Sequence, residues 1–558
     1  MFDLGGYPLL DPDEGRNAEV AREMARTDDY VVPRLNGLPY LDKPVLYYAA
    51  AAASIELLGP TETAARIPSL LFTVATVVLV GWFATRLYGP DGGAVAAAAA
   101  ASTPFALAYA RTVIFDSALT FFVVLALIGF YCAIEGRAAH RARGTEHGAR
   151  DTSPPRAMGP RARINPAWAW TSLAWAAMAL GVLTKGPVAL AVPLLVALPY
   201  AGWRRAWRAV ADATSVLLFA ALLGPWLLAM SREVPGFLQY ALVTETALRL
   251  TTHQLQRVEP FWYFLAIFPA AALPWSVVAV AAWRGRPDPR AVFLLLWIAV
   301  PLLFFTLSQS KRPQYVLPLV HAVALLVAGH WARAARGAPG ARAGAVALAV
   351  LGAGLLVGHR LIAGAVDATA AIAAEIPATA WGLGAACVAG AALAWLGAVR
   401  RREVALLGLV LPVAAIPFVS RGLMDEIGRE RSAAELAAAV ERVLDSDAEV
   451  VGVAAFPLSL PFYLQRPLVL ATDDGAELTS NYLIRHLDQW RRAPGTPLRP
   501  LAWWMDALVT CGRRRVFVVR SEDAGVRRVL EGVVPLLVDT GRYAAYGPCG
   551  AGGFARAG

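Results

Sequence analysis

Charged residues are scarce in this sequence. Only 16% of its 558 residues are charged and 57% are hydrophobic, whereas roughly a quarter of the residues in a soluble domain carry charge. An ordinary soluble protein is therefore excluded, and the composition is typical of a polytopic membrane protein. The formal net charge of +10 does not indicate a nucleic-acid partner, because the arginines lie in short loops between apolar runs, where they set membrane orientation.

Cysteines and short catalytic motifs are scarce as well. The four cysteines are Cys132, Cys387, Cys511 and Cys549, and no pair has the spacing of metal ligands. Cys511 and Cys549 share the C-terminal segment, so they form either a disulfide or two free thiols. No P-loop, GxSxG or zinc-ligand motif points to ATPase, serine hydrolase or metalloprotease chemistry. No basic n-region followed by an apolar h-region is seen, so we expect no cleavable signal peptide.

Long apolar runs make up most of the chain. A membrane helix needs about 20 mostly apolar residues, and this criterion predicts twelve spans. They cover residues 64–85, 92–110, 113–135, 167–184, 186–202, 209–230, 261–283, 291–308, 313–331, 343–359, 378–399 and 403–421.

Arginine clusters give the orientation of these spans. They lie at 137–163, 203–208, 284–290, 331–342 and 400–402, always on the same side of the span count. The positive-inside rule places all five in the cytoplasm. The remaining loops then face outward, including 1–63, 231–260 and the chain after 421. Because a polar N-terminal segment would otherwise cross the membrane unaided, we expect a thirteenth helix upstream in the native protein.

Lysine is rare, and its positions are unusual. The only three lysines among 51 basic residues are Lys43, Lys185 and Lys311. Each maps to the outer end of a helix, against the positive-inside trend, with a proline one or two residues later. Snorkelling at a membrane boundary would explain one of them. Three together favour a functional role, since a compact ammonium suits a phosphate.

Acidic residues follow the same distribution. Asp13 and Glu14 lie with Arg16 in the first outer loop, and Asp42 precedes Lys43. Asp116 lies a few residues into a span, where an ionisable residue is by default a functional-site hypothesis. The alternatives are a structural clamp between Asp116 and Arg111, and an ordinary helix start at Asp13.

A further cluster lies in the outer loop 231–260. Glu245, Arg249, His253 and Arg257 recur every four residues, so they share one helix face. This face is either solvated and ion-paired, or it directs Arg249 into a site shared with the lysines.

These groups suit chemistry on a phosphate-bearing substrate embedded in the membrane. A carboxylate can take a proton from an attacking hydroxyl, and cations can stabilise a departing phosphate. Tyr40 and Tyr315 lie beside two of the lysines. Because no nucleotide is available outside the cell membrane, an activated substrate there would have to be lipid-linked.

Several motifs carry a family resemblance. "PLLDPDEGRNAEVAREM", "LPYLDKPVLYY", "ARTVIFDSALTFF", "GVLTKGPVAL", "PFWYF" and "LSQSKRPQYVLPL" resemble, in order and spacing, the ArnT and protein-mannosyltransferase-like glycosyltransferases of the GT-C class over residues 7–320. The resemblance implies transfer of a sugar from a polyprenyl (undecaprenyl) phosphate carrier to a lipid, glycan or protein acceptor at the periplasmic face of the bacterial inner membrane. In the lipid A branch of the family the donor sugar is aminoarabinose.

The resemblance also implies roles for single residues. Asp13 matches the catalytic Asp, which we expect to be the general base, and Asp116 matches a second essential acid. Lys43, Lys185 and Arg249 match positions near the carrier phosphate. The remaining cavity residues that we expect are Glu14, Arg16, Tyr40, Asp42, Lys311 and Tyr315. Two departures are Asn17, where many relatives have Tyr, and Asp42 in place of a common Glu.

The expected architecture has three parts. Residues 1–63 form the first periplasmic loop, with short helices lying along the membrane. Residues 64–421 form the transmembrane GT-C domain. Residues 424–558 form a small α/β domain, with helices near 431–444 and 522–533 and strands near 448–456 and 514–521. We expect this domain to be a lid, an acceptor-side module or a structural cap.

Other readings stay open. A transporter or flippase of lipid-linked sugars would place charges near the bilayer midplane, in repeated halves, and neither feature is seen. A non-catalytic partner in an envelope complex would tolerate loss of Asp13. Paired acids could also hold a divalent cation, but no ligand spacing supports one.

Overall fold

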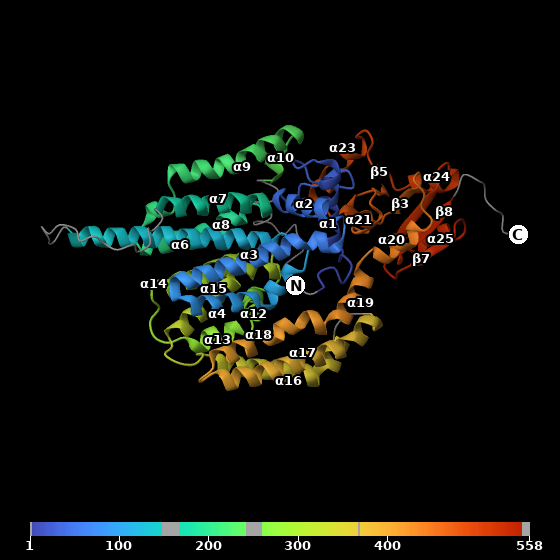
Figure 1. Ribbon diagram of the computed structural model, residues 1–558. Coiled ribbons are helices and arrows are strands. Elements are labelled where there is room, and N and C mark those ends of the chain that lie inside the picture. The colour runs from blue at the N-terminus through green and yellow to red at the C-terminus, as the bar shows by residue number, and fades with distance from the viewer. Residues whose placement is uncertain (1–2, 148–166, 242–258, 366–368, 550–558) are drawn as a thin grey trace.

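A bundle of long helices carries a small α/β domain at one end (Figure 1). The computed structural model describes residues 3–147, 167–241, 259–365 and 369–549. The predicted fold class, a polytopic helical membrane protein with a small C-terminal α/β domain, is confirmed.

Each predicted span contains helix, but the described residues hold fewer span-length helices than the twelve predicted. In the described part of the chain, nine helices are long and apolar enough to cross a membrane. They are α3 (Glu62–Tyr88), α6 (Asp116–His147), α7 (Ala167–Lys185), α9 (Ala213–Glu233), α14 (Pro289–Leu307), α15 (Leu317–Arg333), α16 (Ala341–Ala365), α17 (Ala370–Gly397) and α18 (Arg402–Val419). The stretch predicted at 186–202 forms α8 (Val188–Trp203), which is shorter than these.

Two predicted spans are broken. The first is α4 (Pro90–Ala101) with α5 (Pro104–Ala110), bent by 63°, and the second is α12 (Tyr263–Ala271) with α13 (Trp275–Ala282), bent by 95°. Pro104 begins α5 and Pro274 immediately precedes α13. A proline donates no backbone hydrogen bond and restricts the residue before it, which accounts for a break at each place. Counting each pair as one span gives up to eleven.

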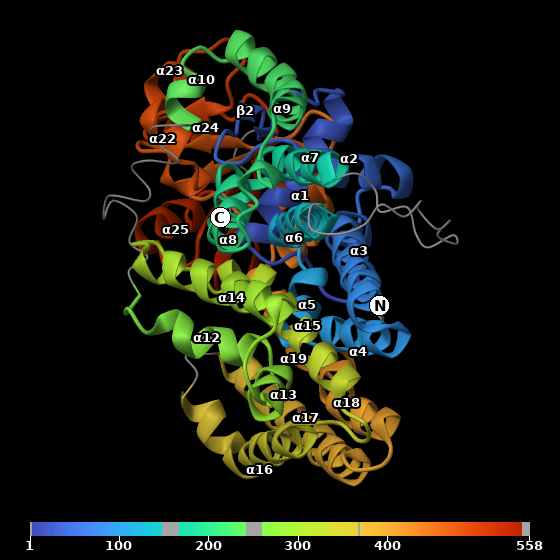
Figure 2. The ribbon, with the colours of Figure 1, turned by 90° about the vertical axis from the view of Figure 1, so that its left-hand side faces the viewer.

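The arginine-rich loops that the structure describes gather at one end of the bundle. Arg204 pairs with Glu135 at 2.7 Å and Arg333 with Asp288 at 3.0 Å, while Arg402 donates to the carbonyl of Ala334. At the other end, α6 and α15 begin and α7 and α14 finish, next to the N-terminal segment and the C-terminal domain (Figures 1 and 2). The two sets of loops that the positive-inside rule separates are therefore at opposite ends.

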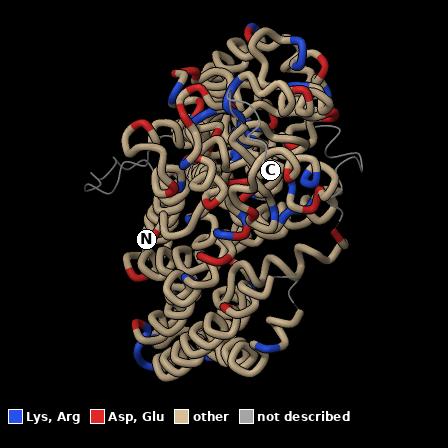
Figure 3. Tube along the Cα trace, turned by 90° about the vertical axis from the view of Figure 1, so that its right-hand side faces the viewer, with Lys and Arg blue, Asp and Glu red and all other residues tan. Residues whose placement is uncertain are grey.

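Charge follows this arrangement. Seen from the side of the C-terminal domain, Lys, Arg, Asp and Glu gather on that domain and near the helix ends, and the helices below it are mostly uncharged (Figure 3). This is the distribution expected of helices that face lipid and of loops that face water.

The N-terminal segment is buried between the bundle and the C-terminal domain. It contains α1 (Asp13–Thr27), the hairpin β1 (Arg34–Leu35) and β2 (Leu38–Pro39), and α2 (Leu46–Leu58). Most side chains of α1 are buried, including Glu19 and Arg22, which pair at 2.7 Å, and its position along the membrane surface stays a prediction. Asn36, at the hairpin turn, exchanges two hydrogen bonds of 2.8 Å with the backbone of Leu468, so the C-terminal domain covers this segment.

The C-terminal domain is built on a six-stranded sheet. Its strand order is β5-β4-β3-β6-β8-β7, with β5, β4, β3 and β6 parallel and β8 antiparallel to both neighbours. The strands are β3 (Glu449–Val453), β4 (Val469–Ala471), β5 (Leu498–Arg499), β6 (Arg515–Arg520), β7 (Leu536–Asp539) and β8 (Tyr543–Cys549). The helices are α20 (Ala434–Glu441), α21 (Leu460–Leu464), α22 (Asn481–Arg485), α23 (Leu487–Arg491), α24 (Trp503–Thr510) and α25 (Ala524–Glu531), and α19 (Arg421–Arg431) joins the domain to α18.

Cys511 and Cys549 form a disulfide, which settles the alternative left open by the sequence. The bond closes a loop with a sequence separation of 38 residues, a length for which loop entropy predicts about 4 kcal/mol of stabilisation. We expect the double variant Cys511→Ser/Cys549→Ser to unfold its C-terminal domain at a lower temperature, measured by limited proteolysis on heating. Reductant should lower the unfolding temperature of the wild type to that of the double variant and leave the double variant unchanged. A wild type whose unfolding temperature does not change with reductant would contradict the assignment.

The interface between the N-terminal segment and the C-terminal domain contains a buried carboxyl group, that of Asp11. The amide of Asp11 donates to the carbonyl of Arg431 at 2.7 Å. Gly15 lies so close that a Cβ there would be 2.1 Å from Asp11 Oδ1 and 2.6 Å from the Cβ of Ser459. Burial raises the pKa of Asp11 to about 7, although Ser459 and Arg542 oppose the shift.

Asp11 makes the stability of this interface depend on pH. An unfolded Asp has a pKa of about 3.9, so the folded state binds a proton more tightly. The stability contributed by this group is then present below about pH 4 and is lost as pH rises through about 7. We expect the thermal midpoint of the wild type to fall, relative to that of Asp11→Asn, between pH 5 and pH 8. Parallel pH profiles for the two proteins would contradict this.

Candidate active site

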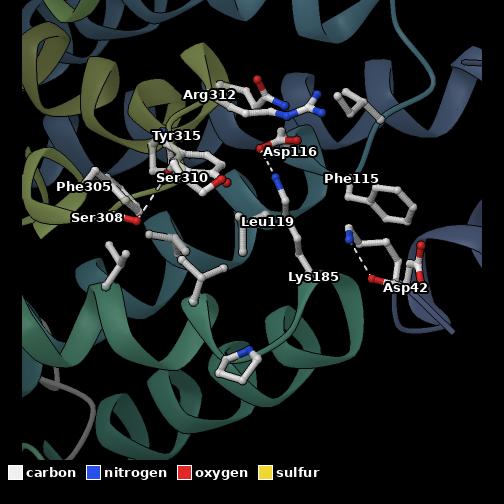
Figure 4. Close-up of a pocket in the computed structure, with 18 of the residues that line it drawn as sticks. Asp42, Phe115, Asp116, Leu119, Lys185, Phe305, Ser308, Ser310, Arg312 and Tyr315 are labelled. Carbon is white, nitrogen blue, oxygen red and sulfur yellow. Dashed lines mark hydrogen bonds and ion pairs between the residues drawn. The ribbon is translucent and has the colours of Figure 1, made fainter. Parts of the chain in front are cut away.

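A cavity of about 320 Å³ opens where the N-terminal segment, the bundle and the C-terminal domain meet. One part of its lining is polar, with four cations and three carboxylates: Arg16, Lys43, Lys185, Arg312, Asp13, Asp42 and Asp116. The other part is apolar and comes from the helices of the bundle: Leu119, Val123, Val188, Val192, Phe304, Phe305 and Pro318 (Figure 4). The cavity therefore suits a ligand with a charged head and a hydrocarbon tail.

Asp13 lies between two arginines. It is the first residue of α1, where a carboxylate is stabilised by the helix dipole, and Arg16 lies one turn later at 2.5 Å from Asp13 Oδ1. Arg312 approaches the other oxygen at 3.6 Å. The Asp13 side chain is 39% exposed, so it is held in place and still reachable. Burial lowers the pKa of Arg16, but Tyr40, Asp13 and neighbouring groups raise it by more, and Arg16 stays charged.

Asp116 and Lys185 form a pair deeper in the cavity. Asp116 begins α6 and Lys185 ends α7, so each charge has the sign that its helix terminus favours. Their side chains are 2.5 Å apart (Figure 4), and Lys185 Nζ lies 5.6 Å from the centre of the Tyr315 ring. Gly186, with φ of 87°, ends the helix directly after Lys185. The second Asp116 oxygen is buried and has no hydrogen-bond partner in the described part of the chain.

The alternative interpretation of Asp116, a structural clamp with Arg111, is wrong. Arg111 donates to the carbonyl of Asp3 at 2.8 Å, and Lys185 takes its place beside Asp116. The two cavity residues Asp116 and Lys185 thus restrain each other.

Asp42, Lys43 and Tyr40 line the cavity from the N-terminal segment. Lys43 Nζ donates to the Asp42 carbonyl at 2.6 Å. The Asp42 carboxylate accepts hydrogen bonds from the Tyr240 hydroxyl at 2.8 Å and from the Asn481 amide at 3.2 Å. Asp42 therefore links the cavity to the C-terminal domain.

Glu14 and Lys311 do not line the cavity, which corrects two sequence predictions. Consecutive helical residues project about 100° apart, so Glu14 points away from the cavity and is buried against Arg66 at 2.9 Å. Lys311 donates to the carbonyl of Glu259 at 3.2 Å. Arg312 follows it in extended backbone, where neighbouring side chains point to opposite sides, and Arg312 lines the cavity instead.

Sequence reasoning missed several lining residues. Arg312 lies in the motif "LSQSKRPQYVLPL", and alternation along the extended segment could have identified it. Asn481 lies in the C-terminal domain more than 400 positions from Asp13, where the sequence offers no signal. The other missed lining residues with polar side chains are Asn17, Ser308, Ser310 and Gln314.

Two predictions remain outside what the structure describes or tests. Arg249 lies outside the described residues, as do Glu245, His253 and Arg257. Within the described ranges, no group of three or more His, Cys, Asp or Glu side chains could hold a metal ion, so the divalent cation stays a prediction.

The chain is similar in sequence to known sugar transferases. The family described as dolichyl-phosphate-mannose-protein mannosyltransferase matches residues 42–142. The undecaprenyl phosphate-alpha-4-amino-4-deoxy-L-arabinose arabinosyl transferase of Edwardsiella ictaluri is 32% identical over 339 residues, which cover 59% of this chain and 57% of that protein. The namesake protein of Pseudomonas aeruginosa (strain LESB58) is 32% identical over 337 residues, with the same coverage. The match thus spans less than two thirds of these relatives.

Solved structures match over a much larger part of the chain. The crystal structure of ArnT from Cupriavidus metallidurans bound to undecaprenyl phosphate has a TM-score of 0.80 at 23% identity and covers 98% of this chain and 95% of that one. The apo form of that protein has a TM-score of 0.78, also at 23% identity, covering 98% and 94%. The fold is shared, and the resemblance predicted from the motifs is confirmed.

Proposed function

We propose that this chain, which resembles ArnT in sequence and shares its fold, is a membrane glycosyltransferase that moves a sugar from an undecaprenyl phosphate carrier to an envelope acceptor. The observation that carries the proposal is the cavity with a charged part and an apolar part. A polyprenyl phosphate-linked sugar has the same division, because its phosphate and sugar are polar and its polyprenyl chain is hydrocarbon.

The cavity orients such a donor. Bundle residues such as Val123, Val188 and Phe305 contact the beginning of the hydrocarbon chain, which gains by leaving water. Lys43 and Lys185 then lie near the phosphate, where a compact cation acts as a point charge. Arg249, predicted to lie near the carrier phosphate, is a third cation for it.

Asp13 is the general base of the proposed reaction. Its carboxylate takes the proton of an acceptor hydroxyl while that oxygen forms a bond to the anomeric carbon of the sugar. The bond between the anomeric carbon and the phosphate oxygen breaks, and its electron pair stays on the carrier phosphate. The lysines stabilise the charge that develops there. The products are the glycosylated acceptor, the polyprenyl phosphate and one proton, which Asp13 passes to water.

Asp116 fixes Lys185 for this step. The pair at 2.5 Å holds the ammonium near the leaving group. The unpartnered Asp116 oxygen is an acceptor for a hydroxyl or amino group of the donor sugar.

The periplasmic side of the inner membrane is the proposed location of the site. All the arginine-rich loops that the structure describes lie at the far end of the bundle, as the positive-inside rule requires of cytoplasmic loops. The Cys511–Cys549 disulfide in the C-terminal domain is typical of an oxidising compartment such as the periplasm.

A transfer assay with purified protein in lipid nanodiscs tests the proposal. Undecaprenyl phosphate carrying aminoarabinose or a hexose is mixed in turn with lipid A, a glycan and a peptide acceptor, and products are identified by mass spectrometry. We expect one pair to yield a glycosylated acceptor and an equal amount of undecaprenyl phosphate. Flipping of the donor without transfer would favour the transporter reading, and no product with any pair would favour a non-catalytic envelope partner.

A further inference from the structure

A hydrogen bond connects the C-terminal domain to Arg16, the arginine that pairs with the proposed general base Asp13. The guanidinium of Arg16 donates from Nη2 to Asp13 at 2.5 Å and from Nη1 to the Thr479 hydroxyl at 2.9 Å. Arg16 is partly buried on the cavity wall, while Thr479 lies exposed in the C-terminal domain. One arginine side chain therefore joins Asp13 to a domain that follows it by more than 400 residues.

Thr479 has an unusual backbone conformation. Its φ is 52°, in the left-handed region, which a β-branched residue rarely adopts because of steric conflict with its own backbone. The amide of Thr479 donates to the carbonyl of Ala476 at 3.0 Å and closes the turn. Strained residues of this kind persist where surrounding contacts fix them, often at functional sites.

The segment around Thr479 is fixed at both ends. Ahead of it, the Thr472 hydroxyl accepts from the Gly475 amide at 2.9 Å and donates to Glu477 at 2.7 Å. After it, the Ser480 hydroxyl and the Asn481 amide donate to the Asp42 carboxylate at 3.3 and 3.2 Å. The Thr479 hydroxyl is therefore presented to Arg16 from a fixed position.

We infer that Thr479 is a positioning residue for the Asp13–Arg16 pair, and that the C-terminal domain is thereby part of the active site. The inference rests on the proposed function, because it assigns the pair to catalysis. Arg16 with both arms occupied can hold the Asp13 carboxylate in one orientation. Without the Thr479 acceptor, the planar guanidinium of Arg16 can rotate as a unit about its side-chain bonds, and the Asp13 carboxylate loses its alignment with the acceptor hydroxyl.

Thr479→Val tests this inference, because it removes the hydroxyl and keeps the side-chain shape. We expect kcat to fall about tenfold, since small misplacements of catalytic groups cost one to two orders of magnitude. KM for the donor should stay within about twofold, because Thr479 is not among the residues that line the cavity. The assay uses undecaprenyl phosphate-linked aminoarabinose and lipid A as the first donor–acceptor pair.

Three controls separate positioning from a structural role. Thr479→Ser keeps the hydroxyl and should restore kcat. Thr510→Val is the same substitution at an exposed threonine of the same domain and should leave kcat unchanged. In an Arg16→Gln background, Thr479→Val should have little further effect, because two residues that act through one interaction are not additive.

The outcomes distinguish this inference from the proposed function. If Asp13→Asn shows a kcat loss of about 10²-fold or more and Thr479→Val has wild-type kcat, the inference is overturned and the proposed function stands. A loss shared by Thr479→Ser, or an equal loss in the Arg16→Gln background, would also overturn it. An Asp13→Asn variant that keeps more than half of the wild-type rate would overturn both this inference and the assignment of Asp13 as the base.

Discussion

Asp13→Asn is expected to lower kcat by about 10²- to 10⁴-fold, the range that general acid–base catalysis contributes. The amide has nearly the shape of the carboxylate but cannot accept the proton of the attacking hydroxyl. KM for the donor should change little, because the phosphate and lipid contacts lie elsewhere in the cavity. The measurement is the rate of sugar transfer in nanodiscs, with the thermal midpoint recorded on the same samples.

The fold should survive this change. Asp13 is 39% exposed and pairs with Arg16 and Arg312 at the cavity mouth, and ion pairs in contact with water contribute little to stability. We therefore expect an unchanged thermal midpoint. A variant that keeps more than half of the wild-type rate would show that Asp13 is not the base.

Glu14→Gln is expected to lower stability and to affect the transfer rate much less than Asp13→Asn. The expected loss is about 3–5 kcal/mol in the free energy of unfolding. Glu14 binds Arg66 through both oxygens at 2.9 Å and accepts amide hydrogen bonds from Leu10 and Val113. Arg66 is fully buried and lies 3.9 Å from the centre of the Tyr7 ring. Removing one charge from this pair leaves a buried guanidinium without its counter-ion.

Thermal unfolding of purified Glu14→Gln, followed by tryptophan fluorescence, measures this loss. Asp13→Asn is the matched control, since it makes the same type of change at the adjacent residue. At a temperature where Glu14→Gln is still folded, its transfer rate should be within about tenfold of wild type. A small displacement of the neighbouring Asp13 costs less rate than removal of the base itself. A Glu14→Gln midpoint equal to wild type would contradict the structural role.

Local sequence patterns predicted much of the fold and the cavity. Apolar length located every stretch that became a bundle helix, and arginine position separated the two ends. Asp13, Arg16, Tyr40, Asp42, Lys43, Asp116, Lys185 and Tyr315 all line the cavity, as expected from motifs that lie at helix ends. Helix ends carry unpaired backbone groups and their dipole charge, so charged residues placed there are informative even in one sequence.

What the sequence did not predict depends on tertiary contacts. Glu14 and Lys311 resemble their neighbours Asp13 and Arg312 in chemistry, and only the direction of the side chain separates them. Part of the burial of α1 comes from the C-terminal domain, since Gly15 lies against Ser459. Asn36, in the hairpin that follows α1, bonds the backbone of Leu468, which is also more than 400 positions away. Thr479 and Asn481 reach the site by the same docking, which no local pattern encodes.

Mass spectrometry of membrane lipids and envelope glycans in a strain that lacks the gene tests the central claim most directly. The deletion strain is complemented with wild type, Asp13→Asn or Thr510→Val. The account predicts that a polyprenyl phosphate-linked sugar accumulates on deletion and that one acceptor loses the mass of the same sugar. It also predicts that wild type and Thr510→Val reverse both changes and Asp13→Asn reverses neither. Unchanged lipids and glycans on deletion, or full complementation by Asp13→Asn, would contradict it.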